Sequence, residues 1–342
     1  MSQVRVLPPQ PFHSPFHRPM PLKNIAAIVL AAGQGKRMKS NLPKVLHPVL
    51  GQPMLAYVLE SLAMAGFERP IVVVGHAGNQ VVEFIKDRAQ IAWQKEQLGT
   101  GHAVRCAMPL LEDFEGDVIV TNGDVPLVPP NCYVNLVTAR RKRDYAALIS
   151  SIVLDKPASY GRIKRDGLGD VEGIVEFRDA NDDEILIREV NSGTYCFNAA
   201  DLRESIDKIK NHNAQGEYYL TDTIAYLKKK GRGVGAVIHP EASDFLGIND
   251  PADMALVEGK LGDRVKYQIL SSGVRIDDPA SVRIEPGVQI GPRTRILSGV
   301  TLEGKTVVGS DCVIGPHVTL SDVRIEDSTI VSPHLISRNR RT

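Results

Sequence analysis

The carboxy-terminal part of the chain repeats every six residues. Aliphatic side chains recur at this spacing without a break at Ile284, Ile290, Ile296, Leu302, Val308, Ile314 and Leu320. A strict six-residue period is typical of a parallel β-helix, whose coils stack aliphatic side chains on one another. We therefore predict a short left-handed parallel β-helix over residues 273–336. The repeat loses its register after Leu320, which leaves room for about six to eight coils.

Before residue 273 the pattern changes, and short β-branched runs alternate with helical stretches. The predicted strands are 25–30, 70–76, 117–124, 146–154, 171–177 and 190–197, and the predicted helices are 54–66, 81–85, 100–111, 132–143, 200–210, 220–230 and 251–271. Such alternation predicts an α/β, Rossmann-like domain with a mostly parallel sheet that is covered on both faces. Ligands of these sheets bind beyond the carboxyl ends of the strands. The loops after Leu30 and Val120 are therefore the candidate binding loops.

Composition narrows the class of protein. A chain of 342 residues is long for one core, which favours two domains. The net charge of +1 gives no electrostatic reason to bind nucleic acid or a membrane surface. The apolar runs are far shorter than the ~20 residues of a membrane helix. The four cysteines are scattered and no secretion signal is found, so we expect reduced thiols in a cytoplasmic protein.

The first candidate loop is "LAAGQGKRMKSNLPKVLH", residues 30–47. Gly33 and Gly35 allow the backbone to approach an anion, while Arg37 and Lys44 supply positive charge. The loop lacks the glycine-lysine-serine/threonine ending of a Walker loop and the third glycine of a dinucleotide fingerprint. Taken alone, it fits a phosphate loop and an ordinary strand-to-helix turn equally well.

The second candidate loop is "TNGDVPL", residues 121–127. It places the carboxylate of Asp124 at the ligand edge of the sheet. One carboxylate suits a Mg²⁺ ion that is completed by water and substrate phosphates. A plain turn also explains the Asn-Gly-Asp sequence.

Several motifs in order resemble one family. They are the loop at 30–47, "QKEQLGTGHA" (94–103), "NGDVPL", "YGRI" (160–163), "GIVEFRDA" (173–180), "VNSGTYCF" (190–197), "NAQGEYYLTD" (213–222) and "LGIND" (246–250). From about residue 25 to the β-helix, the chain is similar to the bacterial bifunctional N-acetylglucosamine-1-phosphate uridylyltransferase/glucosamine-1-phosphate acetyltransferases. The resemblance implies Mg²⁺-dependent transfer of UMP from UTP to N-acetylglucosamine 1-phosphate, with release of pyrophosphate.

The resemblance also implies a role for particular residues. Arg37 and Lys44 match catalytic cations that contact phosphate, and Asp124 and Asn249 match the metal ligands. The positions that match nucleotide contacts are Leu30, Ala31, Ala32, Gly33, Gln94, Gly99, Thr100, Asn122 and Gly123. The positions that match sugar contacts are Gly161, Glu176 and Asn191.

The predicted domain plan follows from these assignments. It comprises a disordered proline-rich tail (1–23), a sugar nucleotidyltransferase domain (24–250), a linker helix (251–272), the β-helix (273–336) and a basic tail (337–342). No segment resembles the acetyltransferase site of the family, so we expect no acetyl transfer. The β-helix is expected to cap the catalytic domain or to support a homo-oligomer.

Two alternatives stay open at this stage. One is a nucleotidyltransferase for a related sugar 1-phosphate, because a few pocket contacts decide the choice of substrate. The other is a catalytically weak protein that binds a nucleotide sugar.

Overall fold

The computed structural model describes residues 22–75 and 77–339, which belong to two compact units. The larger unit holds residues up to His47 and Pro53–Asp253, and the smaller unit holds Pro48–Gln52 and the chain from Met254 onward. The grouping of Pro48–Gln52 with the smaller unit had no signal in the sequence. The predicted tail at 1–23 lies almost wholly outside the described residues, as does half of the tail at 337–342. None of the described helices has the length and apolar character needed to cross a membrane.

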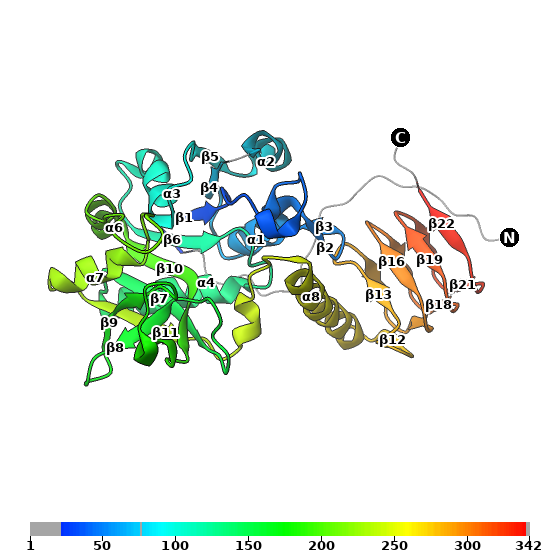
Figure 1. Cartoon of the computed structure of the whole chain (residues 1–342). Helices are drawn as coiled ribbons and strands as arrows, with labels where there is room; N and C mark the ends of the chain where they lie inside the picture. Colours follow the sequence, from blue (N-terminus) through cyan, green and yellow to red (C-terminus); the bar gives the residue numbers. More distant parts are fainter. Residues whose placement is uncertain (1–21, 76, 340–342) are drawn as a thin grey trace. The chain divides into compact units, whose positions relative to one another are not determined.

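The larger unit is built on a nine-stranded sheet with the central order β11-β7-β10-β6-β1-β4-β5 (Figure 1). Its strands are β1 (Ile25–Leu30), β4 (Ile71–Val74), β5 (Gln90–Trp93), β6 (Asp117–Asn122), β7 (Ala147–Val153), β8 (Arg162–Arg165), β9 (Val171–Val175), β10 (Glu189–Asn198) and β11 (Val234–Ile238). Strand β1 pairs in parallel with β4 and β6, whereas β10 is antiparallel to β6 and β7. This mixed, mostly parallel sheet confirms the predicted fold class.

Helices cover both faces of this sheet. The α-helices are α1 (Met54–Met64), α2 (Gly78–Ile85), α3 (Thr100–Ala107), α4 (Pro130–Arg143), α5 (Asp182–Ile185), α6 (Ala199–Ile206) and α7 (Asp222–Lys229), and the 3₁₀ turns are η1 (Lys36–Met38), η2 (Lys44–Leu46), η3 (Lys86–Arg88), η4 (Met108–Leu111) and η5 (Ala242–Phe245). Successive side chains of β1 point to opposite sides: Val29 joins a core with α1 and α4, and Ile28 joins a second core with α3 and α6. The two cores confirm the prediction of a sheet covered on both faces.

Two sequence predictions of elements need correction. The helix predicted at 100–111 ends at Ala107 and continues as η4, where Pro109 lies in the first turn. Proline lacks the N–H that would continue the α-helical hydrogen bonds. Strands β5, β8 and β11 were not predicted, and β8 reads "RIKR", which lacks an apolar run.

The carboxyl ends of β1 and β6 lie side by side, as predicted. Leu30 is in register with Asn122, and the Gly123 N–H donates to the Leu30 carbonyl oxygen at 2.9 Å. Strand β10 runs antiparallel to β6, with Tyr195 opposite Val120. It therefore begins at the edge of the sheet where β6 ends. Loops from three strands therefore meet at one edge of the sheet.

The smaller unit is a parallel β-helix that follows helix α8 (Pro251–Ser271). Its strands are β12 (Arg275–Ile276), β13 (Arg283–Ile284), β14 (Gln289–Ile290), β15 (Arg295–Ile296), β16 (Thr301–Glu303), β17 (Val307–Val308), β18 (Val313–Ile314), β19 (Thr319–Ser321), β20 (Arg324–Ile325), β21 (Ile330–Val331) and β22 (Ile336–Arg338). Two further short strands, β2 (Pro48–Val49) and β3 (Gln52–Pro53), precede α1. The strands of the β-helix form three parallel sheets, one for each side of the coil.

The predicted number of coils was wrong. Ile284 pairs with Leu302, and Leu302 pairs with Leu320, so one coil takes three six-residue repeats. One side of the β-helix has the four strands β12, β15, β18 and β21, so the described residues form about four coils instead of six to eight. The stacking itself is confirmed, since Ile284, Leu302 and Leu320 are all buried.

Candidate active site

Lys44 joins two side chains that are remote from it in the sequence. Its ammonium donates hydrogen bonds to Asp124 Oδ2 at 2.5 Å and to Asn249 Oδ1 at 2.9 Å. The Lys44 and Asp124 side chains are 13% and 21% exposed, so the cluster is shielded from water but still reachable. The structure thus brings together one predicted phosphate-binding cation and both predicted metal ligands.

Backbone contacts fix the two oxygen donors. The Ile248 N–H donates to the Asp124 carbonyl oxygen at 3.1 Å, which ties the loop after β6 to the segment that carries Asn249. The Asn249 N–H donates to Asp253 Oδ2 at 2.8 Å. Both side chains therefore point at one place from anchored backbone.

The donor set fits a magnesium ion. A carboxylate and an amide oxygen are the hard ligands that Mg²⁺ prefers, and in this structure both already coordinate one positive charge, the Lys44 ammonium. Two protein ligands leave most of an octahedral shell to water and phosphate oxygens. Asp124 and Asn249 are therefore the residues that would hold the ion.

The loop after β1 reaches this cluster through Gly35. Gly35 has a φ of +60°, and a Cβ built on it would lie 2.7 Å from Lys44 Cβ. Gly33 is exposed, and a Cβ there would have no heavy atom within 4 Å. Arg37 is exposed and forms no hydrogen bond or ion pair with any described residue, so the structure does not join it to the Lys44 cluster. Gly35 is the structurally required glycine of this loop.

This difference between the two glycines gives a stability prediction. Gly35→Ala should lower the free energy of unfolding by about 1–2 kcal/mol, since alanine is strained at positive φ and its Cβ meets Lys44. Gly33→Ala is the matched control and should change it by less than about 0.5 kcal/mol. Urea unfolding of both variants measures the difference. Equal effects would show that the close approach to Lys44 does not constrain the loop.

The predicted nucleotide segment 94–100 is held from several sides. The buried Gln94 donates from Nε2 to the Gly99 carbonyl oxygen at 3.0 Å. Thr100 Oγ1 accepts the Leu220 N–H at 3.0 Å. Gly99 has a φ of +105°, and a Cβ there would lie 2.6 Å from the Tyr218 carbonyl oxygen. The segment is thus packed against the "EYYLTD" motif, although Thr100 and Leu220 are 120 positions apart in the sequence.

The three predicted sugar-binding residues lie together. The Asn191 N–H donates to the Gly161 carbonyl oxygen at 2.9 Å, and a Cβ on Gly161 would lie 3.4 Å from Glu176 Oε2. Asn191 Oδ1 accepts the Gly193 N–H at 3.0 Å. A Cβ on Gly193 would clash with the Asn122 amide, so this glycine links the predicted sugar residues to the loop after β6.

Glu176 lies in an unusual electrostatic environment. Burial raises the pKa of its carboxyl group, and the negative charges of Asp222, Asp179 and Glu217 raise it further. A hydrogen bond from Thr221 Oγ1 to Glu176 Oε1 at 3.0 Å opposes these effects on the pKa. The charged form of this carboxyl group therefore destabilises the folded protein, which is a frequent property of residues at functional sites.

The chain matches two family models and many curated relatives. Residues 27–179 match the MobA-like NTP transferase domain, and residues 281–322 match the bacterial transferase hexapeptide family with its six repeats. The chain is 42% identical over 314 residues to the bifunctional protein GlmU of Heliobacterium modesticaldum, covering 92% of this chain and 69% of that protein. The chain belongs to the GlmU family.

Other GlmU proteins give the same result. The GlmU of Geobacillus sp. strain WCH70 is 43% identical over 305 residues, which are 89% of this chain and 66% of that protein. The GlmU of Enterococcus faecalis is 39% identical over 318 residues, or 93% of this chain and 69% of that protein. The chain thus spans about two thirds of the length of its GlmU relatives, and the predicted resemblance is confirmed.

Three residues that contact the predicted site residues were not predicted from the sequence. Gln97 donates from Nε2 to the Ala32 carbonyl oxygen at 2.6 Å and so joins the nucleotide segment to the loop after β1. Thr221 holds Glu176. Burial and the charges of Asp124 and Asp253 raise the pKa of Tyr160, and a hydrogen bond with the Gly247 backbone opposes this. All three residues lie within motifs that resemble the family, and this was the only sign in the sequence that they belong near the site.

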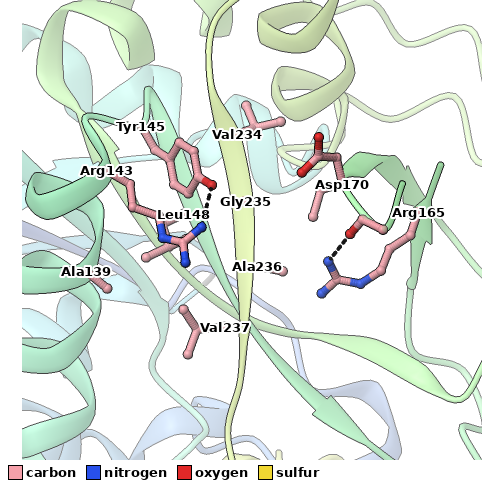
Figure 2. Close-up of a pocket in the computed structure, with 12 residues that line it drawn as sticks. Ala139, Arg143, Tyr145, Leu148, Arg165, Asp170, Val234, Gly235, Ala236 and Val237 are labelled. Carbon is pink, nitrogen blue, oxygen red and sulfur yellow. Dashed lines mark hydrogen bonds between the residues drawn. The ribbon is translucent and has the colours of Figure 1, made fainter. Parts of the chain in front are cut away.

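A pocket of about 310 Å³ lies elsewhere on the GlmU-type domain (Figure 2). It is lined by β11, the end of α4 and the loop before β9, and none of the predicted site residues lines it. Its two guanidinium groups already have partners: Arg143 Nη1 donates to Tyr145 Oη at 3.3 Å, and Arg165 Nη1 donates to the Gly169 carbonyl oxygen at 2.8 Å. The pocket is therefore separate from the candidate active site.

Proposed function

We propose that this GlmU-family chain transfers UMP from UTP to N-acetylglucosamine 1-phosphate in the presence of Mg²⁺. The products are UDP-N-acetylglucosamine and pyrophosphate. The observation that carries the proposal is the convergence of Asp124 and Asn249 oxygens on one cation at the edge where β1 and β6 end. The NTP transferase match over residues 27–179 supports the same reaction class.

The site arrangement suits a reaction between two polyanions. Gln97 joins the predicted nucleotide-binding segment to the loop after β1 by a hydrogen bond. Gly193 packs against Asn122 and so places the predicted sugar-binding residues beside the loop after β6. In the proposed reaction, a phosphate oxygen of the sugar attacks the α-phosphorus of UTP, and pyrophosphate leaves as the bond to it breaks. Holding both substrates in line supplies much of the rate enhancement in such a reaction.

Stabilisation of the negative charge in the transition state supplies the rest of the rate enhancement. When bound, Mg²⁺ offsets negative charge that develops on the phosphates in the transition state. Lys44 adds a second positive charge, and it can move from Asp124 to a phosphate oxygen through rotation about its own side-chain bonds. The attacking phosphate has a second pKa near 6 and is mostly ionised at neutral pH, so the reaction needs no general base. His102 is therefore not needed as a base, and its Nδ1 forms a hydrogen bond with Gln94 Nε2 at 3.1 Å.

A substrate panel tests the proposal. Release of pyrophosphate is measured for each combination of UTP, ATP, CTP, GTP and TTP with N-acetylglucosamine, glucosamine, glucose and N-acetylgalactosamine 1-phosphates. We expect kcat/KM to be highest for UTP with N-acetylglucosamine 1-phosphate. A higher value for another pair would assign a related nucleotidyltransferase, and no turnover with any pair would leave nucleotide-sugar binding as the function.

The proposal covers the nucleotidyl-transfer reaction. The expected lack of acetyl transfer and the expected self-association through the β-helix remain predictions. An acetyl-coenzyme A assay with glucosamine 1-phosphate tests the first, and light scattering of the purified chain tests the second.

Glu176→Gln should weaken sugar binding and stabilise the protein. We expect KM for the sugar phosphate to rise about tenfold, because a charged acceptor becomes neutral. The folded carboxyl binds its proton more tightly than the unfolded one, so the wild type loses stability as pH rises from the ordinary value of 4.5 through the raised pKa. The variant has no carboxyl group at this position and therefore does not lose this stability as pH rises. Its melting temperature should exceed that of the wild type at neutral pH.

The pH dependence distinguishes the cause of this effect. The difference in melting temperature should shrink as pH falls through the raised pKa and disappear below 4.5, where the wild-type carboxyl becomes neutral in both states. Glu172→Gln, an exposed position on β9, which directly precedes Glu176, is the matched control and should alter neither quantity. A difference that is constant with pH would contradict a charge effect.

A further inference from the structure

A cysteine, a histidine and an aspartate form a second cluster in the larger unit. Cys132 is the third residue of α4, His239 follows β11, and Asp244 lies in the 3₁₀ turn η5. One potential ligand atom from each residue lies within 4.8 Å of the other two. None of these residues belongs to the proposed nucleotidyl-transfer site.

The geometry of the cluster is close to that of a metal site. Cys132 Sγ lies 2.8 Å from His239 Nε2, and a carboxylate oxygen of Asp244 belongs to the same set of ligand atoms within 4.8 Å of one another. A tetrahedral zinc ion, at ~2.3 Å from sulfur and ~2.0 Å from nitrogen, separates these two ligand atoms by about 3.5 Å. The Cys132–His239 pair therefore needs to open by less than 1 Å, roughly, to admit the ion.

Burial and backbone contacts hold the ligands in place. Cys132 and Asp244 are buried, at 8% and 6% exposed, whereas the His239 side chain is 22% exposed and leaves a way in. The His239 N–H donates to the Ser151 carbonyl oxygen at 2.7 Å, and its ring packs edge-on against Phe245. His239 Nδ1 lies 3.3 Å from the Glu241 carbonyl oxygen and 3.4 Å from the Glu241 nitrogen. With a proton on Nδ1, the carbonyl is the outer contact that metal-binding histidines commonly have, and Nε2 is left to bind the ion.

The chemistry of the donors selects the metal. A thiolate, an imidazole and a carboxylate together are typical zinc ligands, and a hard ion such as Mg²⁺ avoids sulfur. The first turn of the 14-residue helix α4 also favours the negative charge of a thiolate at Cys132. Three protein ligands leave the fourth position of a tetrahedral ion to water.

A catalytic triad is a poorer explanation of the same residues. The 4.0 Å between His239 Nδ1 and Asp244 Oδ2 is too long for the orienting hydrogen bond of a triad. Cys132 is also buried in the hydrophobic core, whereas the nucleophile of a triad must be open to its substrate. Metal ligation needs neither feature.

We propose that Cys132, His239 and Asp244 form a zinc site with three protein ligands. The site would join the start of α4 to η5, which directly precedes the "LGIND" segment with Asn249. Bound zinc would therefore stabilise the backbone that leads to the proposed magnesium ligand. This inference does not depend on the proposed function.

Cobalt(II) titration of the full chain, without nucleotide or magnesium, tests the proposal. We expect a thiolate-to-cobalt charge-transfer band that saturates at one equivalent and disappears when zinc is added. Zinc alone should raise the melting temperature by several degrees, since it binds the folded state. The band requires sulfur, so cobalt bound at Asp124 or at histidines cannot produce it.

Variants assign the band to these residues. Cys132→Ser should abolish it, and Asp244→Asn and His239→Asn should weaken cobalt binding more than the roughly 10–100-fold cost of losing an outer contact. Cys106→Ser is the matched control: its sulfur lies 3.8 Å from His102 Nε2, and the described residues offer no third ligand there. It should leave the band unchanged.

The outcomes separate the alternatives. A folded wild-type chain without the band at one equivalent would overturn the proposal and leave a plain hydrogen bond between Cys132 and His239. A full band in Cys132→Ser, or its loss in Cys106→Ser, would overturn the assignment. If Cys132→Ser does not fold, the Asp244→Asn and His239→Asn affinities decide, because unchanged affinity in both would equally refute the site.

Discussion

Asp124→Asn should reduce the rate of uridylyl transfer at least about 1,000-fold, which corresponds to about 4 kcal/mol of lost transition-state stabilisation. Asp124 is the charged member of the two converging ligands, and Asn249 is neutral. The substitution keeps the shape of the side chain and one oxygen for the Lys44 hydrogen bond, yet removes the charge that attracts a divalent cation. The free energy of unfolding should change by less than about 1 kcal/mol, because the Lys44–Asp124 pair is partly exposed.

Pyrophosphate release at increasing magnesium concentration measures the effect. We expect kcat to fall and the magnesium requirement to rise, while urea unfolding stays close to that of the wild type. Asp87→Asn, an exposed position in η3, is the matched control for the loss of one carboxylate. Turnover of Asp124→Asn within tenfold of the wild type would exclude Asp124 as an essential metal ligand.

The β-helix illustrates what can be predicted from a repeat. The period of six placed aliphatic residues such as Ile284 and Leu302 in the interior, because any other phase would expose them. The period could not give the number of coils. That number depends on three repeats closing one turn, which is a property of backbone pairing between residues 18 positions apart, as for Ile284 and Leu302.

The sheet edge was predicted for a similar reason. Two buried strands that end in polar loops place those loops together when the strands are parallel neighbours, as Leu30 and Asn122 are. Strand β8 was missed because its charged side chains give no alternating apolar pattern. Burial of Arg162 in β8 depends on partners supplied by the surrounding loops, including the Ala158 carbonyl oxygen.

The sequence named candidate site residues but could not give their contacts. Matching motifs gave Lys44, Asp124 and Asn249, whereas their hydrogen bonds join residues 80 and 205 positions apart and arise from the tertiary fold. Gln97 and Thr221 escaped because amides and hydroxyls are common in loops and have no spacing of their own. The scattered cysteines likewise gave no reason to pair Cys132 with His239, 107 residues away.

Lys44→Met should lower kcat/KM about 100–1,000-fold and yet bind a divalent metal more tightly in the absence of nucleotide. The first effect follows from the loss of a positive charge beside the proposed phosphate position. The second follows from the structure, in which the ammonium occupies the place where Asp124 and Asn249 oxygens converge. A metal that enters the wild-type site must displace this ammonium, and methionine removes that competition.

Binding of Mn²⁺, followed by its electron paramagnetic resonance signal, separates the two effects. Lys39→Met removes a charge from the same loop at an exposed position and should change neither turnover nor metal affinity. If Lys44 served the phosphates alone, its variant would lose turnover with unchanged metal affinity, and competition for the two oxygens would be excluded. Weaker metal binding would instead show that Lys44 holds Asp124 and Asn249 in position. Tighter binding with lost turnover is the outcome that the 2.5 Å contact between Lys44 and Asp124 predicts.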